Sequence, residues 1–244
     1  MALLVLALLV GGCRLDVRTE VAIGADGAAS IGVVLLMDPT LVTELDVLGV
    51  DPTAELEAAV AVDQDWDVVR TTGDEGLTVR LDRTVATVDA IGPALRALAE
   101  GTGAGDPRLA FDLEVTRDAD GRIDVDGEAG WQVPDRPVAV LDDEPVGPEA
   151  DEIAALVAAS TDVSLVVTMP GNVTAHDATA VDGRTLTWTL PPDTTVSVQA
   201  SSAPPAWWQV LPWWLLVGTV AGLVFGLAAI GWLLRRARRA QAAS

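Results

Sequence analysis

The stretch that decides the fold is VSLVVTMPGNVTAHDATAVDGRTLTWTL, residues 163–190. Apolar and polar residues alternate at both of its ends, and this period of two predicts a pair of half-buried strands. Pro170 and Gly171 predict a tight turn directly after the first strand. Asp182 and Gly183 are typical of a hairpin turn before the second strand. The stretch therefore predicts a closing β section for the domain.

The same alternation continues outward, interrupted by segments with a helical period. Residues 14–23 and 28–37 predict a hairpin about an Ala-Asp-Gly turn. Pro39 directly after Asp38 predicts a helix start. The remaining expected strands cover 66–71, 77–81, 108–116, 123–130 and 195–201, and the expected helices cover 39–48, 53–62, 88–100 and 149–159. Because hairpins dominate and a regular βαβ alternation is absent, we expect an α+β domain that is mainly antiparallel and has several helices.

The N-terminus has the pattern of a lipoprotein signal. Residues 1–12 read MALLVLALLVGG, which is too short for a bilayer-spanning helix but has the length of a signal-peptide apolar core. The tetrad Val10-Gly11-Gly12-Cys13 resembles the bacterial lipobox. We therefore expect cleavage before Cys13 and a diacylglycerol on its thiol. The alternative is a short buried helix with an inert cysteine.

The C-terminus predicts one transmembrane helix, preceded by a Pro- and Trp-rich linker over residues 203–212. The uncharged run 213–234 has 22 residues, which reach about 33 Å and so match a bilayer core. Indole rings favour the headgroup zone, and basic residues stay in the cytoplasm. The interface tryptophans are Trp207, Trp208, Trp213, Trp214 and Trp232, and the basic tail 235–244 contains Arg235, Arg236, Arg238 and Arg239. This pattern places residues 13–202 outside the cell membrane and the C-terminus inside.

Small residues recur at every fourth position of the expected span. Gly218, Gly222 and Gly226 fall on one face of a helix with this spacing. Such a face lets two transmembrane helices approach closely. Glycine is also common in membrane helices for other reasons, so the spacing is compatible with a dimer without requiring one.

These features together resemble the LppM-type lipoprotein domains of actinobacteria. The residues that carry the resemblance are Cys13 and, in the closing stretch, Pro170, Gly171, Gly183 and Trp188. The resemblance implies an α+β fold and binding of envelope glycolipids such as phosphatidylinositol mannosides. The residues themselves give the motif a structural reading. Trp188 is expected to pack inward as a core aromatic, and the alternative is a ring that stacks on a ligand.

The composition excludes several function classes. The formal net charge is −21 and the four arginines of the tail lie outside the domain, so nucleic acid is excluded as a partner. Cys13 and His176 are the only residues of their types, which rules out a multi-Cys or multi-His metal site and a cofactor held by one. No nucleophile elbow or phosphate loop is present. The acid groups around Asp65, Asp118 and Asp142 are expected to be solvated faces instead of Ca²⁺ sites.

We therefore expect a non-enzymatic envelope lipoprotein, held at the membrane lipids, whose ectodomain binds a lipid, a glycolipid or another apolar ligand. A sheet with helices on one side can enclose a pocket for such a ligand. The rival interpretation is a module that docks onto another envelope protein, for which an acidic surface selects basic partners. A hydrolase of envelope polymers is the least favoured interpretation, because recognisable catalytic motifs are missing.

Overall fold

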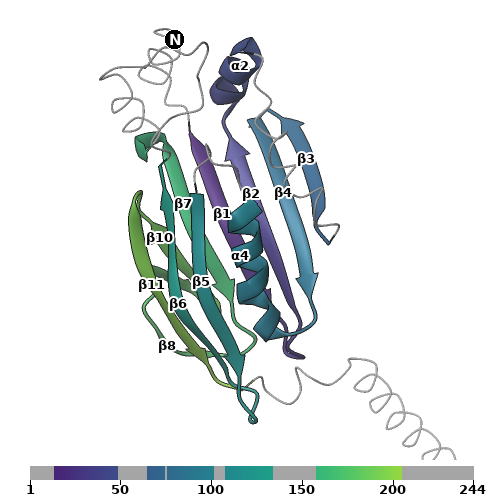
Figure 1. The fold of residues 1–244 in the computed structure, drawn as a ribbon, viewed down its shortest axis with the longest axis vertical. Coiled ribbons are helices and arrows are strands. Elements are labelled where there is room, and N and C mark those ends of the chain that lie inside the picture. Colours follow the sequence, from purple (N-terminus) through teal and green to yellow (C-terminus); the bar gives the residue numbers. More distant parts are fainter. Residues whose placement is uncertain (1–13, 49–64, 75, 102–107, 134–157, 205–244) are drawn as a thin grey trace, which may run out of the picture. The chain divides into compact units, whose positions relative to one another are not determined.

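The computed structural model describes residues 14–48, 65–74, 76–101, 108–133 and 158–204 (Figure 1). All of them belong to one compact unit that ends at Pro204. The expected signal peptide and lipobox, the linker beyond Pro204, the expected span and the basic tail lie outside these residues. Within the described ranges no helix has both the length and the hydropathy needed to cross a bilayer.

The described part of the domain contains eleven strands, three helices with both ends described, and a helical segment at residues 158–160. The strands are β1 (Leu15–Ile23), β2 (Ala29–Met37), β3 (Asp67–Gly73), β4 (Gly76–Val85), β5 (Arg108–Arg117), β6 (Ile123–Gln132), β7 (Thr161–Thr168), β8 (Val173–His176), β9 (Ala180–Asp182), β10 (Thr185–Leu190) and β11 (Thr194–Ser202). The helices are α2 (Pro39–Leu48), the 3₁₀ turn η1 (Val88–Ala90) and α4 (Ile91–Gly101).

The strands form two sheets. The larger has seven strands in the order β3-β4-β2-β1-β7-β10-β9, and the smaller has four in the order β5-β6-β11-β8. Neighbouring strands run antiparallel except β1 and β7, whose parallel register joins Val17 to Val163 and Thr19 to Leu165. After β7 the chain crosses to the smaller sheet for β8, returns to the larger sheet for β9 and β10, and crosses again to the smaller sheet for β11.

The smaller sheet and both α-helices lie on the same face of the larger sheet (Figure 1). The alternating apolar side chains of β1, β2, β7 and β10 face the apolar side chains of β5, β6, β11 and α4 in one core. The largest fully buried side chains include Trp131, Trp188 and Leu165. A smaller cluster of Met37, Leu77 and Val79 packs under α2. The opposite face of the larger sheet carries polar residues, among them Arg80, which pairs with Asp82 at 2.8 Å and Glu20 at 3.3 Å.

The described chain enters and leaves the domain at opposite ends. Leu15 pairs with Met37, whereas the far end of β1 lies at the 24–28 turn. Arg117, at the end of β5, donates hydrogen bonds to the carbonyl oxygens of this turn. Ser202 pairs with Ile123, which itself pairs with Arg117, so β11 ends beside the same turn. Nine residues of β1, about 30 Å of strand, therefore separate the entry from the exit.

The expected α+β class with mainly antiparallel pairing is confirmed for the domain. The expected helix over 88–100 is divided into η1 and α4, with Pro93 in the first turn of α4, where its missing N–H costs nothing. The sequence interpretation missed the parallel β1–β7 pair, and it missed β8 and β9, which fall between the two strands predicted for residues 163–190. The expected helix 53–62 and nearly all of 149–159 lie outside the described residues.

Candidate functional site

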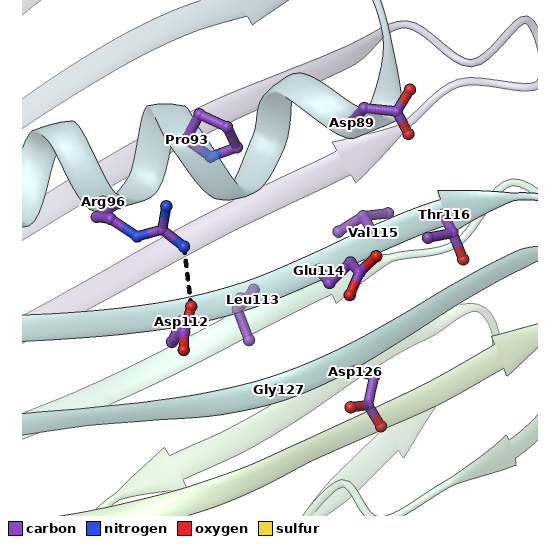
Figure 2. A pocket seen from close by; sticks show the side chains of 10 residues that line it. All are labelled: Asp89, Pro93, Arg96, Asp112, Leu113, Glu114, Val115, Thr116, Asp126 and Gly127. Atoms are coloured by element: carbon purple, nitrogen blue, oxygen red, sulfur yellow. Dashed lines mark hydrogen bonds and ion pairs between the residues drawn. The ribbon is translucent and has the colours of Figure 1, made fainter.

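A hollow of about 530 Å³ opens between α4 and the strands β5 and β6 (Figure 2). One wall comes from η1 and the first turns of α4, which contribute Asp89, Pro93 and Arg96. The other wall comes from the two strands, with Asp112, Leu113, Glu114, Val115, Thr116, Asp126 and Gly127. Alternation along β5 directs Leu113 and Val115 into the core and leaves the side chains between them exposed.

Two glycines set the distance between the walls. A Cβ atom on Gly92 would stand 2.1 Å from the carbonyl oxygen of Leu113, so only glycine lets the first turn of α4 approach β5 so closely. A Cβ atom on Gly127, whose φ is +146°, would stand 2.0 Å from the carbonyl oxygen of Asp112. Both elements therefore contact the backbone of β5 around Leu113, and the hollow forms beside this contact.

The hollow is strongly acidic. The guanidinium of Arg96 donates a hydrogen bond to Asp112 at 2.8 Å, and both side chains remain more than half exposed. Asp89, Glu114 and Asp126 form no ion pair within the described residues. Four carboxylates against one guanidinium give the walls a net charge of about −3. Carboxylate oxygens accept hydrogen bonds, so the hollow suits ligands that offer several hydroxyl or ammonium donors.

The same arrangement is unsuited to an acyl chain or a metal ion. Leu113 and Val115 are about 95% buried and add little apolar surface to the hollow. Within the described ranges no group of three His, Cys, Asp or Glu side chains converges as metal ligands would. Asp118 instead accepts hydrogen bonds from the backbone of Asp120 and Arg122, and so stabilises the β5–β6 turn. Asp63 and the acid group at 142–144 lie outside the described residues.

Pro170 and Gly171 hold the end of the last strand. The carbonyl oxygen of Pro170 accepts a hydrogen bond from Arg184 at 2.9 Å. A Cβ atom on Gly171 would stand 2.1 Å from the carbonyl oxygen of Ala203, and the Ala203 N–H donates to Asn172 at 2.7 Å. The turn at Pro170 and Gly171 therefore packs against Ala203, the residue that directly follows β11. Gly183, with a φ of +60° and open space around it, makes the turn between β9 and β10.

Trp188 is fully buried, and its indole links the two sheets. Its Nε1 donates to Asp177 at 2.7 Å, and the same carboxylate oxygen accepts the N–H of Gln199 at 2.8 Å. Trp188 belongs to β10 of the larger sheet, whereas Gln199 belongs to β11 of the smaller one. Burial raises the pKa of Asp177, but hydrogen bonds from Gln199, Trp188 and Ser197 outweigh this effect and hold the pKa below its usual value. Trp188 thus packs inward and offers no stacking surface.

The single histidine, His176, lies on an edge strand of the smaller sheet. It is the last residue of β8, where it pairs with Ala200 of β11. Its side chain is nevertheless exposed, as expected of a solvated histidine. The residue lies on the strand that Asp177 follows and contributes nothing to the hollow.

Comparison with known proteins now identifies the family. The family model of the LppM domain matches residues 16–203, which is most of the chain. The chain belongs to the LppM-domain family. Among solved structures it is similar to the NMR structure of the folded domain of LppM from Mycobacterium tuberculosis, at 15% identity, with a TM-score of 0.46, over 80% of this chain and 93% of that one. No curated protein matches the chain.

The sequence interpretation of the LppM domain did not find the hollow. Asp89 and Arg96 come from a helical segment, whereas Asp112, Glu114 and Asp126 belong to a hairpin that the sequence predicts separately. The available signal was the alternation of acids with apolar residues in FDLEV, residues 111–115, which marks an exposed acidic strand face. No pattern in the sequence indicates that α4 lies beside this acidic face of β5.

Proposed function

We propose that this chain is a membrane-anchored, non-enzymatic envelope lipoprotein whose LppM domain binds the hydroxyl-rich headgroup of a glycolipid. The observation that carries the proposal is the hollow, whose volume of about 530 Å³ is within the range of small-molecule sites. Its walls offer carboxylate acceptors, and sugar hydroxyls are donors that satisfy such acceptors. Family membership and the expected anchors support the same interpretation.

The charge of the hollow defines the part of the lipid that it would take. With four carboxylates and one guanidinium, the walls repel a phosphate group and favour a neutral sugar. Arg96 is already paired with Asp112, so its charge is not free for an anion. We therefore expect contact with the glycan of a glycolipid, while its phosphate and acyl chains stay in the membrane.

The position of the hollow supports access to a membrane. Thr116, at its rim, pairs with Asp124, and Asp124 pairs with Ser201 near the end of β11. The chain leaves the described domain at this end, and only eight residues, 205–212, separate Pro204 from the expected span. Eight residues extend to at most about 29 Å, which limits how far this end could lie from a membrane.

Vesicle binding by the domain, residues 14–204, tests the proposal. The probes are phosphatidylcholine vesicles with or without a neutral diglycosyl diacylglycerol, and flotation measures the bound fraction. We expect binding only to the glycosylated vesicles. Each of Glu114→Gln and Asp126→Asn should weaken it about tenfold, the equivalent of one hydrogen bond to a charged acceptor.

The matched control is Asp120→Asn, which removes one carboxylate from the β5–β6 turn outside the hollow. It should bind as the unchanged domain does, because Asp120 does not line the hollow. A nonspecific effect of net charge would instead change binding equally in all three variants. Binding that does not depend on the glycan, or that is equal in all variants, would overturn the proposal and favour a protein-docking module.

A further inference from the structure

Three of the four sheet edges among the described strands are protected against pairing with another chain. β5, at one edge of the smaller sheet, is covered by α4, whose Gly92 contacts the Leu113 carbonyl. β8, at the other edge, has four residues, and its register with β11 shifts between Ser201 and Ser202. β9, at one edge of the larger sheet, has only three residues. Short, irregular or covered edges are the devices by which proteins prevent edge pairing.

β3 is the exception at the remaining edge. It has seven residues, all exposed, and pairs with β4 in an uninterrupted register from Asp67 to Gly73. Charged side chains and proline commonly block an edge, and β3 contains no proline and no lysine, with Asp67 and Arg70 as its only charged residues. Val68 and Val69 are 37% and 53% exposed, and Val69 faces the open side of the larger sheet together with Arg80. Such a strand is a template for β-strand addition.

We propose that β3 pairs in antiparallel fashion with β3 of a second copy of this chain, about a two-fold axis at Val69. The pairing would join two seven-stranded sheets edge to edge through an isologous contact. A two-fold axis normal to the sheet keeps each face continuous, so only residues of the same face oppose each other. Of the registers that satisfy this condition, the one centred on Val69 opposes Asp67 to Thr71 and Val68 to Arg70.

The charges, the number of paired residues and the side-chain packing of β3 together select this register. Centring the pair on Arg70 would place two arginines directly opposite each other, and centring it on Asp67 would place two aspartates opposite each other. Like charges that are directly opposite destabilise a strand pair. Centring it on Val68 would pair only three residues of β3 instead of five. The register centred on Thr71 would also pair five residues, but it would oppose Val69 to Gly73, which has no side chain to pack. The register at Val69 instead brings two apolar β-branched side chains together on one face, and such pairs stabilise sheets.

The size of the contact defines where the dimer can form. Five residue pairs extend about 17 Å, so the contact is far smaller than the roughly 1,200 Å² of a stable interface. Two acidic domains also repel each other, since the chain carries a net charge of −21. We therefore expect pairing where a membrane confines the copies, and we expect salt to strengthen it by screening this repulsion. A basic partner protein at the same edge would show the opposite dependence on salt.

Disulfide trapping in the full-length chain tests the proposal. Cys13 is the only cysteine, and the diacylglycerol expected on its sulfur blocks it, so each introduced thiol is the only free one in the chain and the unsubstituted chain serves as the blank. Membranes containing Val69→Cys are oxidised and separated without reductant. We expect at least about five times more dimer than with Val68→Cys, because the two Val68 positions would lie about 8 Å apart, beyond disulfide reach. Val181→Cys, at 46% exposure on β9, measures random collision.

A second pair of variants tests the register. Co-expressed chains carrying Asp67→Cys and Thr71→Cys should form a mixed dimer, since the proposal places these residues opposite each other. The trapped fraction should rise as the salt concentration is raised. Equal trapping at Val69, Val68 and Val181, no trapping at Val69, or no mixed dimer would each overturn the proposal.

Discussion

The hydrogen bond between Trp188 and Asp177 offers the sharpest test of how the two sheets are held together. Trp188 is fully buried, and its Nε1 donates to Asp177 at 2.7 Å, while Gln199 of the other sheet donates to the same carboxylate oxygen. Replacing Trp188 by Phe removes the donor and part of a buried ring. Replacing Asp177 by Ala removes the acceptor for both donors.

The magnitude follows from the two parts of each change. Shrinking a buried aromatic ring and losing its hydrogen bond should together cost about 2–3 kcal/mol for Trp188→Phe. A hydrogen bond to a charged group is worth about 1.5–3 kcal/mol, and the exposure of Asp177 places this one at or below the lower limit. We therefore expect a coupling energy of about 1 kcal/mol between the two changes.

A double-mutant cycle measures this coupling. Urea unfolding of the domain, followed by far-ultraviolet circular dichroism, gives the free energy of unfolding for each variant and for the double variant. Trp131→Phe is the matched control, because the Trp131 indole is also buried but donates to the backbone carbonyl of Leu190 at 2.8 Å. Its combination with Asp177→Ala should be additive. A coupling below about 0.3 kcal/mol for Trp188 would refute the argument that this bond links the sheets.

Three further predictions have defined outcomes. Folding lowers the pKa of Asp177, so the stability that this carboxylate contributes is complete above its unfolded pKa of 3.8 and is lost as the pH falls through its folded pKa. In urea titrations, the excess in free energy of unfolding of the unchanged domain over Asp177→Asn should therefore shrink below about pH 4. Gly171→Ala should cost at least about 2 kcal/mol in thermal unfolding, because its Cβ would clash with the Ala203 backbone, whereas Gly183→Ala, in open space, should cost about 1 kcal/mol. Cys13→Ser should abolish fatty-acid labelling of the full-length chain, and unchanged labelling would contradict the lipobox interpretation.

Much of the local structure follows from patterns that the sequence displays directly. β1 and β2 were expected within one residue of their observed bounds. β1 alternates without interruption, β2 ends in a run of apolar residues, and the turn between them lies at Gly27, whose φ is +93°. α2 begins at Pro39 as predicted, since Asp38 accepts the N–H of Leu41 at 2.8 Å and so caps the helix. Signals of this kind are local, and a short window of residues contains them completely.

The missed elements depend on partners that are distant in the sequence. β8 and β9 have four and three residues, too few for a periodic pattern, and each becomes a strand because β11 or β10 pairs with it. The parallel pair of β1 with β7 joins residues about 146 positions apart, as in Val17 with Val163. No local pattern encodes that adjacency, because it results from burying both strands in one core.

The candidate site shows the same division. The sequence by itself determined the acidic composition and the residue types of the turns, and it predicted the α+β class and favoured inward packing of Trp188, because composition, turn chemistry and alternation are properties of neighbouring residues. Only the tertiary structure decided that Asp89 and Arg96 face Asp112, Glu114 and Asp126 across a hollow. The physical reason is that this meeting requires α4 to settle against β5 at Gly92, and the contact becomes favourable only when the helix, the two sheets and their shared apolar core are in place together.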